Sequence, residues 1–438
     1  MLKKRLLLPA ALAFAVAAPC QPPHATAARD LAEVKPETVG FSSQRLERLH
    51  AMLQKKVDDQ QLPGIVTVLA RHGKIVDFRT YGKRDLASGA PMDKDAIFRI
   101  YSMTKPITGV AMMILYEQGK WSPGDPIAKY IPEFAGLKVF KGMDSGGKAI
   151  VEDPVHAPNM AELMSHTAGF TYGIFGDTPV DKMYRDSAVL DSGNLQQMID
   201  KLARIPLLYQ PGDRWVYSVS VDIQGYLVEK LSGKTLGEFM RENIWQPLAM
   251  KDTGFHIAAE KAGRLAALYA ANPSGGLAVT DGGNVATDYS KEPTMPSGGG
   301  GLLSTAHDYL RFGQMLLNGG ELGGVRILAP SSVTLMRTNR LSPAILNSRE
   351  FGIGFFHMNP GFGFGFDFGV YTDPGFISHT VGTGTYTWGG AAGTWFWIDP
   401  MNDAVFVGMI QRVILPGSPD MDTLAHESVY QALVNPER

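Results

Sequence analysis

The chain has 438 residues, of which 45% are hydrophobic and 19% are charged, and its formal net charge is −2. This composition supplies ample material for a hydrophobic core, and the near-neutral charge argues against a nucleic-acid-binding or anionic-membrane-binding surface. The ten histidines are scattered and the single cysteine has no pair, so the sequence indicates no metal and no cofactor. At this length we expect two lobes; the composition specifies no oligomeric state.

The N-terminus has the layout of a secretory signal peptide. Lys3, Lys4 and Arg5 precede an apolar run, residues 6–18, and small residues follow as far as position 27. The run is too short to span a bilayer as an anchor, so we expect cleavage near residue 27, export to the periplasm or medium, and no integral membrane span. Cys20 raises a lipoprotein alternative, which the preceding proline disfavours.

The segment after the signal peptide predicts helices and strands that lead to one short motif. An amphipathic helix over 44–57 precedes strands over 64–70 and 75–81, which a turn at 71–74 joins.

Residues 102–105 read Ser-Met-Thr-Lys and place a hydroxyl and an amine one helical turn apart. Side chains at i and i+3 lie on the same helix face roughly 5–6 Å apart, so the Lys105 amine can reach the Ser102 hydroxyl. The apolar run 106–116 predicts a buried helix behind them. Because proline is tolerated only near a helix start, Pro106 places Ser102 in or just before the first turn, where free backbone N–H groups are positive. Ser102 is therefore a candidate nucleophile.

A second Ser-x-x-Lys, from Ser145 to Lys148, has a different context. It lies in the polar, glycine-containing run 142–148, which is typical of a turn. Spacing alone does not separate the two copies, but only the first opens an apolar helix.

The remaining patterns predict a helical middle and a return to strands. Helices are expected over 160–165, 195–203, 221–231, 236–243, 307–317 and 423–434, and strands over 351–357, 361–370, 376–381, 392–399 and 404–411. The glycines at 298–301 lack the Lys-Ser/Thr ending of a phosphate-binding loop and favour close backbone approach. We predict an α/β (α+β) fold: an antiparallel sheet flanked by helices from residues 28–119 and 295–438, and a mostly helical inserted lobe over 120–294.

Three separated motifs carry a family resemblance. They are Ser-Met-Thr-Lys at 102–105, Tyr-Ser-Val at 217–219 and Trp-Gly-Gly at 388–390, with supporting segments at 163–170 and 246–250. Together and in this order they resemble the serine β-lactamase and penicillin-binding superfamily, and in particular its class C-like enzymes and the family VIII carboxylesterases. The resemblance covers most of the chain after residue 27 and implies a β-lactamase/transpeptidase-like fold.

Two positions depart from the class C lactamases, whose second motif ends in Asn and whose third begins with Lys. Val219 and Trp388 stand there, so the amide and the carboxylate-binding cation are missing. Family VIII esterases typically carry Trp-x-Gly, and an indole offers an apolar wall to an ester. The resemblance therefore implies substrate contacts by Val219, Trp388, Gly389 and Gly390. No Gly-x-Ser-x-Gly occurs, which excludes the α/β-hydrolase nucleophile elbow.

The chemistry that the resemblance implies is two-step acyl transfer through a Ser102 acyl-enzyme. The base is either Lys105, with its pKa lowered in a dry site, or Tyr217 as a tyrosinate, and the sequence leaves this choice open. Backbone N–H groups of Ser102 and Ala391 are implied as the oxyanion hole, where one donor is worth about 10²–10³ in rate.

We therefore expect an exported serine carboxylesterase that acts on small or short-acyl esters. A β-lactamase, a D-alanyl-D-alanine carboxypeptidase or an acyltransferase of the same fold is the alternative among enzymes. A non-catalytic, penicillin-recognising protein is the alternative outside them. His166 and His379 are further candidates for polar partners in the site, although a histidine is more often a structural residue.

Overall fold

The computed structural model describes residues 27–281, 288–348, 352–353, 356–415 and 417–435. The predicted signal peptide, apart from residue 27, lies outside the described residues, as do Cys20 and parts of the predicted strand 351–357. Among the helices that the structure describes, none has the length and apolar character needed to cross a bilayer.

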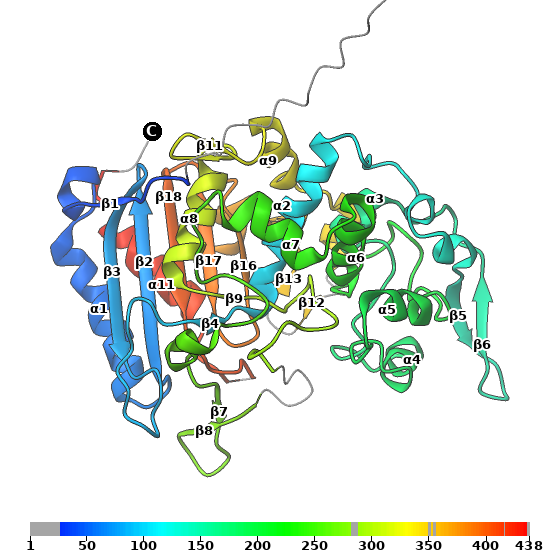
Figure 1. Ribbon diagram of the computed structural model, residues 1–438, viewed down its shortest axis with the longest axis horizontal. Helices are drawn as coiled ribbons and strands as arrows, with labels where there is room; N and C mark the ends of the chain where they lie inside the picture. Colours follow the sequence, from blue (N-terminus) through cyan, green and yellow to red (C-terminus); the bar gives the residue numbers. More distant parts are fainter. Residues whose placement is uncertain (1–26, 282–287, 349–351, 354–355, 416, 436–438) are drawn as a thin grey trace, which may run out of the picture.

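An eight-stranded sheet forms the centre of the molecule, and its strands come from both ends of the chain (Figure 1). In spatial order they are β1 (Ala32–Glu33), β3 (Lys74–Gly82), β2 (Gly64–Arg71), β18 (Ala404–Met409), β17 (Trp395–Asp399), β16 (Tyr386–Gly389), β15 (Gly369–Tyr371) and β14 (Phe362–Phe364). The N-terminal hairpin β2–β3 joins the C-terminal strands through β18. The short edge strand β1 runs parallel to β3, so the sheet is mixed and not purely antiparallel as predicted.

Helices cover both faces of this sheet, which explains why its central strands are apolar at almost every position. Strands β2 and β18 are buried along their whole length. Helices α1 (Ser43–Asp58) and α11 (Met421–Ala432) pack on one face, and α8 (Ala306–Leu317) packs on the other. Buried Leu46, Leu49 and Leu53 of α1 follow the helical spacing that the sequence predicts.

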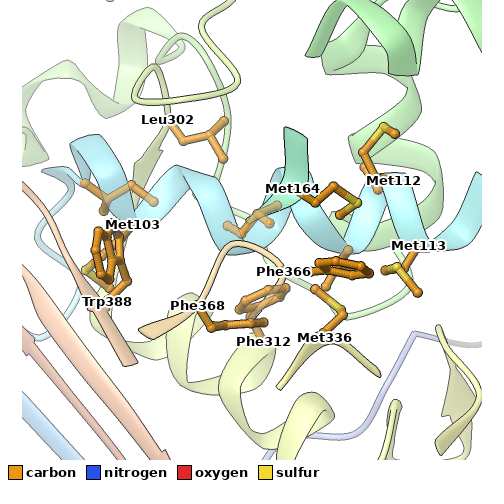
Figure 2. Close-up of a cluster of buried hydrophobic side chains, with 14 of the residues drawn as sticks. Met103, Met112, Met113, Met164, Leu302, Phe312, Met336, Phe366, Phe368 and Trp388 are labelled. Atoms are coloured by element: carbon orange, nitrogen blue, oxygen red, sulfur yellow. The ribbon is translucent and has the colours of Figure 1, made fainter. Parts of the chain in front are cut away.

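Helix α2 (Thr104–Glu117) lies inside the larger core and is buried from Thr104 to Leu115. Figure 2 shows Met112 and Met113 of this helix among Met164, Met336 and Phe366. Unbranched methionines and aromatic rings adapt to the irregular space between a helix and a sheet. Because the burial of α2 begins at its first residue, the core also holds the N-terminal end of the helix, and with it the Ser-x-x-Lys motif, in place.

The middle of the chain forms a region to one side of the sheet, around α6 (Ser220–Ser232) (Figure 1). Its other helices are α3 (Met160–Met164), α4 (Pro179–Asp186), α5 (Leu195–Leu202) and α7 (Leu236–Met240). The hairpin β5 (Val139–Met143) and β6 (Ala149–Glu152) projects from it, so the region is not purely helical. Ser145 lies exposed in the turn of this hairpin, as its polar context predicts. The boundaries at 119/120 and 294/295 remain predictions.

Three C-terminal segments differ from the predicted strands. Residues 376–381 begin in a 3-10 turn, η8 (Pro374–Ile377), because the Asp373 side chain accepts the Phe376 N–H at 3.2 Å and caps it. The segment 361–370 is the hairpin β14–β15, which turns at Asp367 with a φ of 62°. Strand β16, which ends in the Trp-Gly-Gly motif, is a sheet strand that the sequence patterns do not predict.

Further short strands and helices surround the sheet and the middle region. They are the pairs β4 (Phe98–Arg99) with β9 (Leu303–Ser304), β7 (Tyr269–Ala271) with β8 (Leu277–Val279), β10 (Glu321–Leu322) with β11 (Val325–Arg326) and β12 (Gly352–Ile353) with β13 (Phe356–His357), and the helices α9 (Pro330–Met336) and α10 (Pro343–Asn347).

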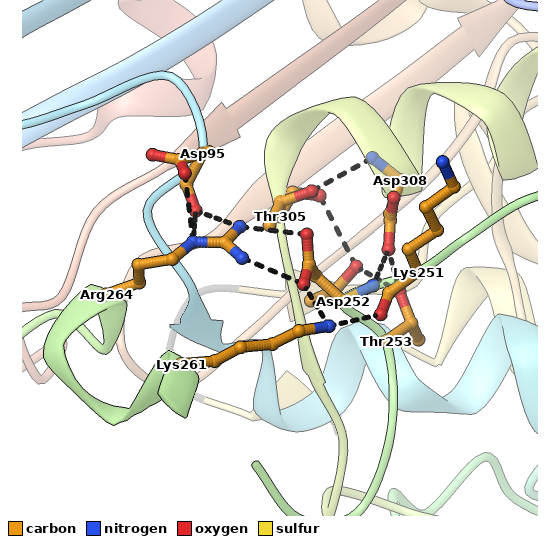
Figure 3. A network of polar contacts seen from close by, with 9 residues as sticks. Asp95, Lys251, Asp252, Thr253, Lys261, Arg264, Thr305 and Asp308 are labelled. Atoms are coloured by element: carbon orange, nitrogen blue, oxygen red, sulfur yellow. Dashed lines mark hydrogen bonds and ion pairs between the residues drawn. The ribbon is translucent and has the colours of Figure 1, made fainter. Parts of the chain in front are cut away.

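A polar network joins the loop after α7 to the start of α8 (Figure 3). The Asp252 carboxylate accepts hydrogen bonds from two Arg264 nitrogens at 3.0 and 2.8 Å, and Lys261 lies 2.8 Å from it. Asp308, in the first turn of α8, accepts the Asp252 N–H at 2.7 Å. Thr305 caps the helix by accepting the Asp308 N–H on its hydroxyl at 3.1 Å.

The buried cap provides a stability test. Thr305→Ala removes the acceptor of a helix N–H that water cannot reach, since Thr305 is only 2% exposed. We expect the free energy of unfolding to fall by about 1 kcal/mol in urea denaturation. The exposed Thr383 is the control, and Thr383→Ala is expected to stay within about 0.5 kcal/mol of the wild type.

Candidate active site

Ser102 lies in a short 3-10 turn, η2 (Tyr101–Met103), directly before α2. Tyr101 has a φ of 40°, a left-handed conformation that costs a non-glycine residue on the order of 1–3 kcal/mol. The Tyr309 hydroxyl of α8 donates to the Met103 carbonyl at 2.9 Å and pins the turn from below. The surrounding core therefore holds Ser102 in a strained and defined position, at the helix start that Pro106 predicts.

Lys105 is fully buried, and its amine has three partners. The Nζ lies 3.1 Å from the Ser102 Oγ and 3.0 Å from the Tyr172 hydroxyl, and it donates to the Gly299 carbonyl at 2.7 Å. Burial lowers the pKa of Lys105 to about 7, although the negative charge of Asp222 opposes this shift. A large share of Lys105 is therefore an uncharged amine at neutral pH and can accept a proton.

Tyr217 lies on the other side of the same hydroxyl. Its OH forms a hydrogen bond with the Ser102 side chain and accepts the Trp388 indole N–H at 3.1 Å. The Lys105 Nζ lies 4.5 Å from the centre of its ring. Burial raises the pKa of Tyr217 well above its usual value, so the residue is a neutral phenol at neutral pH. This geometry favours Lys105 as the proton acceptor and Tyr217 as a hydrogen-bond donor.

The side chains of Trp388 and Val219 are buried in the core. Trp388 is 1% exposed and lies beside Met103 in the core (Figure 2). It belongs to an inner strand of the sheet, so its indole points into the space between the sheet and α2 and supports Tyr217 from behind. Val219 is fully buried at the start of α6. Both side chains are buried, and their predicted contacts with substrate remain predictions.

Gly390 lets the end of β16 approach the nucleophile turn. A Cβ at this position would lie 2.4 Å from the Ile100 carbonyl oxygen and 2.3 Å from the Thr394 hydroxyl, so any larger residue would force the two segments apart. Gly389 is half-buried and Ala391 is exposed. The close approach brings the Ala391 backbone near the Ser102 turn, and the oxyanion roles of both amides remain predictions.

The histidines have separate surroundings. His166 is buried, accepts the Ser218 N–H on Nδ1 at 3.2 Å, and has its ring centre 5.0 Å from that of Tyr217. Burial lowers the pKa of His166 well below its usual value, so it is a neutral support for Tyr217. His379 packs against Tyr371 and His426.

Three residues that surround Lys105 have no catalytic role assigned by the sequence motifs: Tyr172, Asp222 and Gly299. Tyr172 comes two residues after the supporting segment at 163–170, and this proximity is the only local indication of its place in the site. Gly299 belongs to the run at 298–301, for which the sequence predicts close backbone approach. Asp222, on the first turn of α6, has no distinctive local pattern.

Phe175 gives the exposed side of the two tyrosines an apolar edge. It is 52% exposed, and its ring centre lies 5.4 Å from that of Tyr172 and 5.8 Å from that of Tyr217. A separate cavity of about 480 Å³ lies around Trp245 and Phe255, and none of the residues bonded to Lys105 lines it. The chemistry therefore belongs to the Ser102 region and not to that cavity.

The comparisons with known proteins agree on one family. A family model described as Beta-lactamase matches residues 49–431. Esterase EstB of Burkholderia gladioli is 30% identical over 367 residues, which cover 80% of this chain and 86% of EstB. Protein Rv1367c of Mycobacterium tuberculosis is 35% identical over 371 residues, which cover 84% of this chain and 90% of that protein. Other relatives are named as a lovastatin esterase and, provisionally, as D-alanyl-D-alanine carboxypeptidases.

A solved structure has the same architecture. EstCE1, described as a hydrolase with promiscuous acyltransferase activity, superimposes with a TM-score of 0.73 and 25% sequence identity. The match covers 88% of this chain and 99% of EstCE1.

The Trp388 indole N–H can be tested against a matched tryptophan. Trp388→Phe removes the donor to Tyr217, and losing about 1 kcal/mol of hydrogen bonding corresponds to a roughly fivefold fall in kcat/KM. Trp215 packs on the same tyrosine at 6.0 Å between ring centres, and its indole nitrogen has no hydrogen-bond partner among the described residues. Trp215→Phe should therefore cost less activity, and equal losses in the two variants would contradict the assignment.

Proposed function

The chain belongs to the β-lactamase family and is a serine hydrolase with the β-lactamase/transpeptidase-like fold, and from this premise we propose that it is a carboxylesterase acting on small or short-acyl esters. The observation that carries the proposal is the third motif. Where class C lactamases have a lysine that binds the substrate carboxylate, this chain has the buried Trp388, which holds Tyr217. The site thus offers no cation at that position, and an uncharged ester needs none.

The mechanism follows from the protonation states. As the Ser102 Oγ attacks the carbonyl carbon, its proton passes to the uncharged Lys105 amine 3.1 Å away. The backbone N–H groups of Ser102 and Ala391 hold the oxyanion. When the intermediate collapses, the proton held by Lys105 passes by way of the Tyr217 hydroxyl to the leaving alkoxide, so that both residues return to their neutral forms. Water then repeats the attack on the acyl-enzyme and releases the acid.

Acyl transfer to an alcohol is the second candidate, because EstCE1 is described as having promiscuous acyltransferase activity. In this case an alcohol replaces water in the second step. Added methanol would then yield methyl esters from the acyl-enzyme. If no methyl ester forms, hydrolysis is the only reaction supported.

Export belongs to the same proposal, with cleavage near residue 27. The basic and apolar pattern of the first 18 residues supports it. Mass spectrometry of the mature N-terminus tests it, and a lipidated Cys20 there would overturn the unanchored form.

The pH dependence follows from the lysine. Because the pKa of Lys105 is about 7 and only the neutral amine accepts a proton, kcat/KM should rise about tenfold per pH unit below this value. Above it the profile should level off. Stopped-flow hydrolysis of p-nitrophenyl acetate between pH 5 and 9 measures this, and an acid limb centred near pH 4 would exclude Lys105 as the base.

The reaction class is tested with a substrate panel. We expect a burst of p-nitrophenol from short acyl esters, and a higher kcat/KM for these esters than for nitrocefin or D-Ala-D-Ala peptides. Ser102→Ala should abolish turnover, because no other group can form the acyl-enzyme. Ser145→Ala is the matched control, since it alters the exposed second Ser-x-x-Lys and should leave the rates unchanged.

Nitrocefin hydrolysis faster than that of every ester would instead indicate a β-lactamase. Stable labelling by a fluorescent penicillin without any turnover would indicate a penicillin-recognising protein.

A further inference from the structure

A buried carboxylate lies behind Lys105 and organises the peptide that holds it. Asp222 is 2% exposed, and its Oδ1 accepts the Ser297 hydroxyl at 2.5 Å and the Gly299 N–H at 3.1 Å. The carbonyl of the same Gly299 accepts the Lys105 Nζ at 2.7 Å. One side chain of α6 therefore fixes the N–H of the residue whose carbonyl positions the lysine.

Tyr172 forms a second connection between the lysine and this carboxylate. Its hydroxyl lies 3.0 Å from the Lys105 Nζ and faces the Asp222 carboxylate next to Gly299. A Cβ on Gly299 would lie 2.6 Å from the Tyr172 hydroxyl and 2.7 Å from the Asp222 Oδ2. The two polar groups occupy the space that a side chain would fill, so the contact requires glycine.

The protonated lysine needs a negative charge nearby, because an unpaired buried cation is strongly disfavoured. Two acids act on it, Asp222 from α6 and Asp367 from the β14–β15 turn. Burial raises the pKa of Asp367 well above its usual value, and its Oδ1 accepts only the Gln224 amide at 3.1 Å, so its surroundings disfavour the charged form. Asp222 accepts a hydroxyl and a backbone N–H, an arrangement suited to a carboxylate.

The other titratable groups around the lysine carry no charge at neutral pH. Burial raises the pKa of Tyr172 and of Tyr217 above the usual phenol value, and it lowers the pKa of His166. Of the two acids, Asp222 has the larger effect on Lys105, and its hydrogen bonds from Ser297 and Gly299 suit it to balance the charge that the lysine acquires when Ser102 is deprotonated.

We propose that Asp222 is a positioning residue of the reaction: through the Gly299 peptide it holds the Lys105 amine within reach of the nucleophile, and its negative charge stabilises the lysine after proton transfer. The proposal rests on the proposed function of Ser102 and Lys105. It also explains the glycine run at 298–301, which allows a backbone carbonyl to approach a buried amine.

The test uses a fluorophosphonate ester, which reports on the nucleophile whatever the natural substrate is. The Ser102 Oγ forms a bond to phosphorus, the P–F bond breaks, fluoride leaves, and the serine proton passes to Lys105. Asp222→Asn keeps the shape and removes the charge. Without that charge the lysine is a weaker base, so the acid limb of the labelling rate should move down by about one pH unit. The plateau rate should fall by up to about tenfold.

Asp367→Asn is the matched control, because it alters the second buried acid next to the same lysine. Asn readily adopts the left-handed φ of this position. Since burial disfavours the charged form of Asp367, the acid limb should move less than it does in Asp222→Asn. Equal shifts in the two variants, or no shift in Asp222→Asn, would overturn the role of the charge.

Ser297→Ala tests the positioning separately and keeps the carboxylate, should Asp222→Asn fail to fold. Losing the hydroxyl loosens the Gly299 peptide, so we expect a severalfold slower labelling rate with the acid limb unmoved. Labelling at the wild-type rate would overturn the positioning role. If the wild type itself is not labelled at Ser102, the proposed function of Ser102 and Lys105 is wrong. If the wild type is labelled and the variants behave like it, only the role of Asp222 is wrong.

Discussion

The Lys105 amine is buried beside a serine hydroxyl, and the surrounding residues compensate for its lost hydration. Desolvation brings the pKa of the lysine to about 7, where the amine can accept a proton and the ammonium can exist. Such a balance needs acceptors at fixed distances, which the Gly299 carbonyl and the Tyr172 hydroxyl provide. It also needs a limited amount of negative charge, which Asp222 supplies from within the core. A mobile or hydrated amine would return to its ordinary pKa and lose this function.

The fold supplies these partners from distant parts of the chain. Helix α2 is enclosed by the core along most of its length, so its first turn cannot shift to relieve the strain at Tyr101. Strand β16, an inner strand of the sheet, delivers Trp388 to Tyr217 and, through Gly390, brings the following backbone against the nucleophile turn. The same rigid packing that stabilises the protein therefore fixes the distances on which proton transfer depends.

Local patterns were sufficient for the parts of the structure that depend on neighbours in sequence. The tetrad at 102–105 could be separated from its copy at 145–148 because an apolar helix follows only the first. Helix α4 was missed although Thr178 and Asp181 form a capping box around a proline. The wrong strand at 376–381 has a comparable cause, since an aspartate cap outweighs the apolar residues there. Long-range contacts are different: nothing near Asp222 in sequence indicates that its carboxylate meets a glycine peptide 77 positions later.

The position of Trp388 shows why the third motif and the buried lysine depend on each other. The indole lies 1% exposed, with its ring centre 5.2 Å from that of Phe364, and its only polar atom is used on Tyr217. A lysine in this place would put a second ammonium into the same apolar core, where Asp222 already serves Lys105. It would either lose its proton or lower the pKa of Lys105 further through repulsion. A change from ester to carboxylate-bearing substrates would therefore require a rearranged core around Trp388, because the surroundings that make Lys105 basic enough at neutral pH exclude another cation.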